Sequence, residues 1–132
     1  MVEVAAAIIR QQGKVLICQR GEEGNCALQW EFPGGKREEG ETPAQCVVRE
    51  VREELGLDIE VKELYAQLEY HYGARPFHFH FFLCDITGGK LHRDPRVHHD
   101  VQWVKGEQLT AYDFCPADLG VCARLAAEED LA

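Results

Sequence analysis

The segment from Thr42 to Gly56 constrains the fold more than any other part of the chain, because it carries the signals for both ends of a helix. Thr42 precedes a proline and stands three residues before Gln45, which is the spacing of a capping box, and a glycine commonly ends a helix as Gly56 would here. At 100° per residue, the apolar side chains between these ends fall within an arc of about 100°. They are Ala44, Val47, Val48, Val51 and Leu55. The pattern predicts a helix over residues 43–55 with one face against a core.

Runs of apolar and β-branched residues predict strands on both sides of this helix. The expected strands cover residues 2–9, 15–18, 59–61, 64–72, 77–81 and 100–104, and a short strand from residue 30 leads into a glycine turn at residues 34 and 35. A turn at residues 11–14 makes the first two strands a hairpin. A helical turn is expected at 107–109 and a terminal helix at 116–129. Strands that interleave with helices and hairpins predict an α+β domain with a mixed sheet flanked by helices.

The bulk composition limits the domain number and the partners. A chain of 132 residues with 45% hydrophobic residues fits one domain over residues 1–132. The formal charge of −9 argues against binding of a nucleic acid polymer, which requires lysines and arginines to neutralise phosphates. No apolar run reaches the eighteen or so residues of a membrane span, so no membrane partner is expected. The chain is compatible with a monomer or a homodimer.

Six cysteines are present, but none forms a CxxC pair, and the first residues lack the basic and apolar regions of a secretory leader. We therefore expect a reduced, cytoplasmic protein whose cysteines fill the core as small apolar side chains.

Three glutamates of the predicted helix carry its chemistry. Glu50, Glu53 and Glu54 stand at i, i+3 and i+4, where like charges repel unless a cation lies among them. The alternative is a solvated face with helical ion pairs, since Arg49 stands four residues before Glu53. The paired glycines upstream let backbone carbonyls approach a metal closely. Oxygen ligands of this kind suit Mg²⁺ or Mn²⁺, which also bind substrate phosphates.

The spacing around these glutamates resembles the Nudix box of pyrophosphohydrolases. Gly35 is followed after five residues by Glu41, and after seven more by the run Arg49-Glu50-Val51-Arg52-Glu53-Glu54-Leu55-Gly56-Leu57, which matches every fixed position of that box. The flanking segments at 30–36, 68–70 and 113–118 are similar to the MutT branch, the nucleoside triphosphate pyrophosphohydrolases that sanitise the nucleotide pool.

This resemblance implies an α/β/α sandwich around a mixed sheet and hydrolysis of a nucleoside triphosphate to a monophosphate and pyrophosphate. The substrates of such relatives include 8-oxo-dGTP, CTP and 5-methyl-dCTP. By position, the expected metal ligands are the Gly34 carbonyl and Glu50, Glu53 and Glu54. Glu50 is also the position proposed to deprotonate water, Arg49 would orient the glutamates, and Glu41 would support the loop or an outer-shell cation.

The same resemblance implies a set of substrate-binding residues. Its members are Arg20, Glu31, Phe32, Pro33, Lys36, Arg75 and Asp118. Arg20 matches a phosphate-contacting position, and the alternative is a surface charge at a strand end. Arg75 and Asp118 match base-site positions, although a loop arginine such as Arg75 is often only solvated.

The chain departs from the MutT pattern in two places. Asp118 replaces an asparagine, and an ionised carboxylate can only accept hydrogen bonds where an amide both donates and accepts. Val97 stands where many relatives have a metal-binding or water-activating glutamate. Asp100, His98 or His99 could substitute for that glutamate, and a solvated loop is the alternative.

Three other hypotheses stay open at this point. His78 and His80 point to one side of their predicted strand and could bind zinc, although the sequence shows no further aligned ligand. The chain could also hydrolyse another nucleoside diphosphate derivative, or it could be a nucleotide-sensing module without turnover. Sensors of that kind usually lose glutamates of the box, and all of them are present here.

Overall fold

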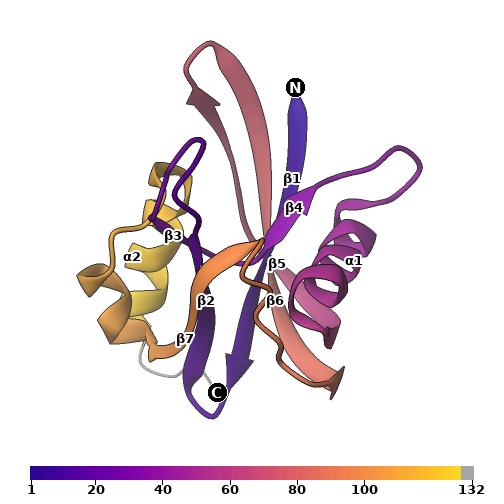
Figure 1. Ribbon diagram of the computed structural model, residues 1–132, viewed down its shortest axis with the longest axis vertical. Helices are drawn as coiled ribbons and strands as arrows, with labels where there is room; N and C mark the ends of the chain where they lie inside the picture. The colour runs from indigo at the N-terminus through magenta and orange to yellow at the C-terminus, as the bar shows by residue number, and fades with distance from the viewer. Residues whose placement is uncertain (129–132) are drawn as a thin grey trace.

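The computed structural model describes residues 1–128 (Figure 1), and residues 129–132, which the single-domain prediction also covered, lie outside the described residues. The described part contains seven strands and two α-helices. In chain order these are β1 (Val2–Gln11), β2 (Lys14–Arg20), β3 (Trp30–Glu31), β4 (Gly34–Lys36), α1 (Pro43–Leu55), β5 (Leu57–Tyr72), β6 (Arg75–Gly89), β7 (His98–Lys105) and α2 (Leu119–Ala127). Two 3₁₀ helices, Gly106–Ala111 and Pro116–Asp118, precede α2. No helix among these residues is long and apolar enough to cross a membrane.

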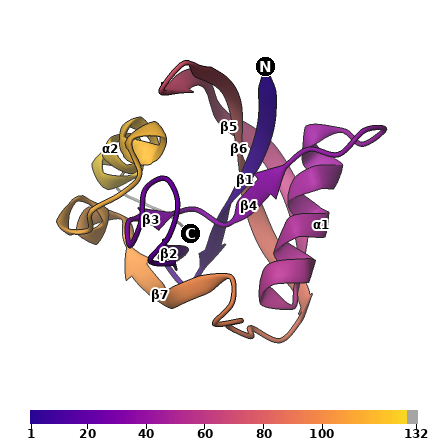
Figure 2. The same cartoon turned by 45° about the horizontal axis from the view of Figure 1, so that its top comes forward.

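All seven strands join one mixed sheet. Its main order is β3-β2-β1-β6-β5, with β4 paired to β1 and β7 paired to β2. The pairing of β1 with β6 is parallel and the other pairings are antiparallel. Helix α1 covers one face and α2 the other (Figures 1 and 2), which confirms the predicted sandwich of helix, mixed sheet and helix.

Helix α1 begins and ends where its sequence predicts. The hydroxyl of Thr42 accepts a hydrogen bond from the Gln45 backbone N–H (3.1 Å), and the Gln45 side chain accepts one from the Thr42 N–H (2.9 Å). At the other end, Gly56 takes the left-handed conformation with a φ of 71°. Because both caps are local, they fix the register of the helix and therefore the direction of each glutamate.

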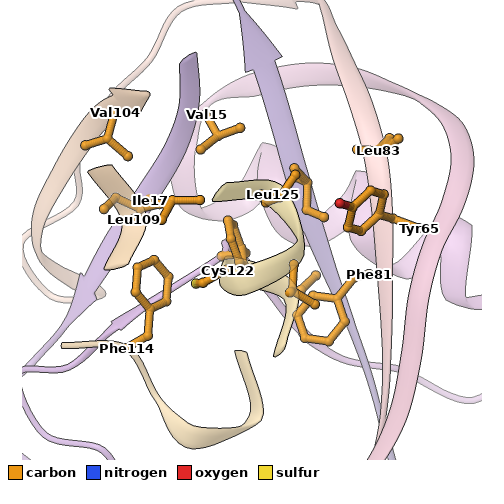
Figure 3. Close-up of a cluster of buried hydrophobic side chains, with 14 residues drawn as sticks. Val15, Ile17, Tyr65, Phe81, Leu83, Val104, Leu109, Phe114, Cys122 and Leu125 are labelled. Atoms are coloured by element: carbon orange, nitrogen blue, oxygen red, sulfur yellow. The ribbon is translucent and has the colours of Figure 1, made fainter. Parts of the chain in front are cut away.

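Each face of the sheet has its own core. Along β1, Ala5, Ala7 and Ile9 pack towards α1, while Ala6 and Ile8 belong to the cluster beneath α2. Figure 3 shows the α2 side, where aromatic and aliphatic side chains of the sheet surround Cys122 and Leu125. All six cysteines are free thiols, and five of them are buried.

The observed elements differ from the predicted ones mainly in length. The two expected strands at 59–61 and 64–72 are one strand, β5, because bulges near residues 62 and 65 absorb the interruption in the apolar pattern. The expected glycine turn is instead the strand β4, which pairs with β1. The predicted terminal helix begins as a 3₁₀ turn at 116–118 and continues as α2, and its last predicted residue, Glu129, lies outside the described residues.

Candidate active site

A cavity of about 750 Å³ opens between β1, the start of β4, the loop after β2 and the segment before α2. This volume falls within the range of small-molecule sites, about 300–1,000 Å³. The cavity collects most of the predicted site residues. Those that line it are Arg20, Glu31, Phe32, Gly34, Lys36, Glu54 and Asp118.

The glycine pair allows two close approaches at the start of β4. Gly34 lies against the backbone of β1, where an added Cβ would stand 2.7 Å from the Ala6 Cα and 2.9 Å from the Ala5 carbonyl carbon. Gly35 lies against the carboxylate of Glu50, whose oxygens would stand 2.5 and 2.8 Å from such a Cβ. The absence of side chains therefore sets both the sheet pairing and the position of a helix glutamate.

Arg49 holds three glutamates of the α1 segment in fixed positions. Its guanidinium donates to both oxygens of Glu41, at 3.0 and 2.7 Å, and also to Glu50 (2.9 Å) and Glu53 (3.2 Å). These bonds hold the pKa of Glu41 at about 2. A planar guanidinium with five donors can bridge several carboxylates in this way, whereas an ammonium group cannot.

Arg20 lies beside the cavity in a network of its own. It donates to Glu31 (2.9 Å) and to the main-chain carbonyl of Asn25 (3.0 Å), so the loop after β2 is attached to β3 through this side chain. Burial raises the pKa of Glu31 in spite of the arginine. Arg20 therefore faces the cavity with part of its positive charge offset by the Glu31 carboxylate.

Asp118 and aromatic side chains form another part of the wall. Asp118 is 5% exposed, and its Oδ2 accepts a hydrogen bond from the Phe32 backbone N–H (3.0 Å). Burial raises the pKa of Asp118 to about 8. Tyr72, Phe77 and Phe79 reach the same cavity from β5 and β6.

The sequence did not identify these aromatic residues as site residues. The alternation of phenylalanines in 77–81 was a signal for a strand only, and their role follows from the pairing of β6 with β1.

The comparisons with known proteins agree with this geometry. The NUDIX domain family matches residues 1–125 of the chain. The chain belongs to the Nudix family. It is 38% identical to a CTP pyrophosphohydrolase of Escherichia coli (strain K12) over 119 residues, which cover 90% of this chain and 87% of that protein. It is 35% identical to an 8-oxo-dGTP diphosphatase of the same strain over 125 residues, covering 94% and 95%. The solution structure of the E. coli ORF135 protein superimposes with a TM-score of 0.82 at 36% identity and covers 98% of this chain and 95% of that one.

These findings confirm the predicted enzyme class: the protein is a Nudix hydrolase, which acts on phosphorus anhydrides of nucleotides. Nudix hydrolases use divalent cations, and the helix glutamates of this chain fit such ions. Burial and then the neighbouring carboxylates, above all that of Glu50, raise the pKa of Glu54 to about 9. Carboxylates that disfavour one another's ionisation are stabilised by a cation among them. Glu50, Glu53 and Glu54 supply the oxygen ligands that hard divalent cations prefer.

The segment around Val97 provides a histidine at the site of this Nudix hydrolase. Val97 itself is 39% exposed on the cavity wall. His98 is 1% exposed, and its Nε2 lies 3.4 Å from Glu54 and 3.9 Å from Glu31. Burial lowers the pKa of His98 to about 4, so the imidazole is neutral at pH 7. Of the three residues considered as substitutes at the Val97 position, the structure brings His98 into contact with a predicted metal ligand.

The other two candidates for this position, His99 and Asp100, have different surroundings. His99 lines the cavity but is exposed, and Asp100 hydrogen-bonds to Val101 and Gln102 within its own strand.

Two predicted substrate-binding residues lie away from the cavity wall. The Pro33 carbonyl accepts a hydrogen bond from the Ala7 N–H (2.7 Å), which joins the β3–β4 link to β1. Arg75 is exposed, with its guanidinium 5.8 Å from the centre of the Phe77 ring. Neither residue is among the described residues that line the cavity. Their assignment to substrate binding stays a prediction from the family resemblance.

Proposed function

We propose that this Nudix hydrolase is a Mg²⁺-dependent nucleoside triphosphate pyrophosphohydrolase that sanitises the nucleotide pool, with a modified purine or a cytosine nucleotide as substrate. Mn²⁺ would serve as an alternative ion. One observation carries the proposal: groups that suit a divalent cation and groups that suit a nucleobase line the same cavity. Gly34 and Glu54 contribute to it together with Asp118, Phe77 and Phe79. The names of the two E. coli relatives, a CTP pyrophosphohydrolase and an 8-oxo-dGTP diphosphatase, support the same substrate class.

The base is expected to bind between the aromatic side chains and Asp118. The Phe32 N–H occupies Oδ2 of Asp118, which leaves Oδ1 for a ligand. With a pKa of about 8, this carboxyl group is mostly protonated at pH 7 and can donate a hydrogen bond to an acceptor of the base. When ionised it accepts instead, for example from an exocyclic amino group. One residue can thus serve a purine and a pyrimidine in different protonation states.

The triphosphate is expected to extend towards the α1 glutamates. When bound there, a divalent cation neutralises phosphate charge and lowers the pKa of water. The oxygen of a water molecule forms a bond to one phosphorus, the anhydride bond of that phosphorus breaks, and a nucleoside monophosphate and pyrophosphate leave. Glu50 accepts the proton of the water, and Arg49 keeps the carboxylate oriented during this transfer. Lys36, exposed at the cavity edge, contributes positive charge to the phosphates.

A substrate panel with Mg²⁺ tests the proposal. The panel contains 8-oxo-dGTP, dGTP, CTP, dCTP, 5-methyl-dCTP and ADP-ribose, and pyrophosphate or phosphate-ester release gives kcat/KM for each. The highest value is expected for a modified or pyrimidine nucleoside triphosphate. A clear preference for ADP-ribose would refute the substrate assignment.

The metal assignment is tested with Glu53→Gln, which keeps the shape of the side chain and removes its charge. Its matched control is Glu39→Gln, an exposed glutamate that has no ion pair among residues 1–128. We expect a loss of at least 100-fold in kcat/KM for Glu53→Gln and no change for the control. Unchanged pyrophosphate release by Glu53→Gln would show that the metal site lies elsewhere.

A further inference from the structure

A second cluster of potential metal ligands lies on the opposite side of the sheet from the cavity. Along β6, Phe77 and Phe79 reach the cavity, so His78 and His80 point to the other face, as does Phe82 in the core cluster under α1. The parallel pairing of β1 with β6 sets Glu3 directly opposite His78. The fold therefore supplies the third ligand that the His78 and His80 pattern lacks in the sequence.

The ligand atoms of these three residues converge. One atom from each of Glu3, His78 and His80 lies within 4.8 Å of the other two. The Glu3 carboxylate is 3.0 Å from His78 Nδ1, and the two imidazole rings are 4.3 Å apart between centroids. In a tetrahedral zinc site with bonds of about 2.0–2.2 Å, ligand atoms stand about 3.4 Å apart. Small rotations of the side chains would therefore bring all three atoms to bonding distance of one ion.

Both ring nitrogens of His78 face oxygen atoms that accept hydrogen bonds. Nε2 lies 3.2 Å from the Gln67 side-chain oxygen, and the neutral tautomer that fits this contact has its proton on Nε2. A neutral His78 then directs the unprotonated Nδ1 at a carboxylate oxygen of Glu3, and two acceptors at 3.0 Å need a positive charge between them. A histidine ligand whose other ring nitrogen donates to an oxygen is the usual arrangement around a bound metal.

The contacts of His80 favour a metal ion over a proton between His78 and Glu3. A protonated His78 would satisfy Glu3, but it would leave the buried Nδ1 of His80 with no hydrogen-bond partner among the described residues. It would also place a cationic ring against a second imidazole. A metal ion uses one lone pair from each histidine and one from the carboxylate at once, and so gives the buried Nδ1 of His80 a partner.

We propose that Glu3, His78 and His80 form a binding site for a transition-metal ion of the Zn²⁺ class. Two imidazoles and one carboxylate are a zinc-type donor set with one position left for water, whereas the α1 glutamates offer oxygen atoms only. The two sites are separate, since Glu54 of α1 lines the cavity and none of Glu3, His78 and His80 does. An ion bound here cross-links β1 to β6, the only parallel pair among the described strands, and so stabilises the fold.

Calorimetric titration of chelator-treated protein with Zn²⁺ tests the site, with excess Mg²⁺ present to occupy the carboxylate site. We expect one equivalent of Zn²⁺ to bind and the melting temperature to rise. The double substitution His78→Gln and His80→Gln is expected to weaken this binding by at least tenfold and to abolish the thermal shift. His71→Gln, an exposed histidine of the same hairpin, is the matched control and is expected to behave as the unmodified protein.

Two further measurements keep the test decisive. Glu3→Gln removes a ligand from β1 without changing the shape of the side chain, and circular dichroism of each variant without metal shows whether it folds. Co²⁺ in place of Zn²⁺ should give the absorption of a tetrahedral site without a thiolate charge-transfer band. Zinc binding that survives the histidine substitutions, or that Glu53→Gln abolishes, would overturn the proposal. This outcome is independent of whether the enzyme hydrolyses any nucleotide of the panel.

Discussion

Substitution of Gly35 by alanine should separate activity from stability in this enzyme. The added Cβ would lie 2.5 and 2.8 Å from the two carboxylate oxygens of Glu50, where ordinary contacts begin near 3.4 Å. The carboxylate must therefore move by about 1 Å. If Glu50 is the base that we propose, a displacement of this size should cost about 100-fold in rate. Because the end of a glutamate side chain yields easily, we expect the free energy of unfolding to change by less than about 1 kcal/mol.

Two other glycines provide the comparison. At Gly34 the added Cβ would meet the main chain of Ala5 and Ala6, which cannot rotate away, so Gly34→Ala should cost about 1–3 kcal/mol of stability or more. At Gly120 in α2 nothing lies within 4 Å of the added Cβ, and Gly120→Ala should keep full activity with equal or slightly greater stability.

Steady-state pyrophosphate release and thermal unfolding of the three variants measure both quantities. A Gly35→Ala variant with the kcat/KM of the unmodified enzyme would refute the argument that this glycine positions Glu50.

Three further predictions follow from the same contacts. Arg49→Lys should lower kcat at least tenfold, because a lysine cannot bridge Glu41, Glu50 and Glu53. It should cost less than about 1 kcal/mol of stability, because partly exposed ion pairs contribute little to the free energy of unfolding. Steady-state kinetics and denaturant unfolding of one preparation check both. Mg²⁺ at 100 times its Kd should stabilise the protein by about 2.7 kcal/mol, and chelation should reverse this; an unchanged melting temperature would contradict the carboxylate site. The pKa of Asp118 is about 8 in the folded protein, above the unfolded value of about 3.9, so the folded state binds the extra proton and stability falls as pH rises from about 4 to 8. The Asp118→Asn variant has no carboxyl group to titrate here, so its unfolding free energy should rise relative to that of the unmodified protein between pH 4 and 8. A difference between the two proteins that stays constant over this range would count against the raised pKa.

Local signals predicted the parts of this structure that depend on neighbouring residues. The caps at Thr42 and Gly56 fix α1 through hydrogen bonds between residues three or four apart, and so their sequence pattern was sufficient. The same holds for Arg49 and its partner Glu53, one helical turn away. The longer connection from Arg49 to both carboxylate oxygens of Glu41 was not predicted, because the family resemblance assigned Arg49 to the helix glutamates and Glu41 to the loop or an outer-shell cation.

Contacts between distant segments were not accessible in this way. Whether His98, His99 or Asp100 reaches the glutamates depends on the register of β7 against β2, which shifts between Gln19 and Arg20, and a shift by one residue moves every side chain of a strand to the other face. The aromatic part of the cavity wall depends likewise on which face of β6 the phenylalanines occupy. Sequence periodicity shows that two faces exist, but it does not show what each face meets.

Alternate residues of β6 therefore present aromatic side chains on one face of the sheet and potential metal ligands on the other. Phe77 and Phe79 line the cavity proposed for the nucleotide, and His78 and His80 meet Glu3 on the α1 side. Both sets depend on the parallel pairing of β6 with β1, so that a change in this register would disturb them together. If the zinc site is occupied, it holds that register from the face opposite the substrate. A protein with a formal charge of −9 would then place its cations at two points, one at the phosphates and one at the strand pairing that shapes the base pocket.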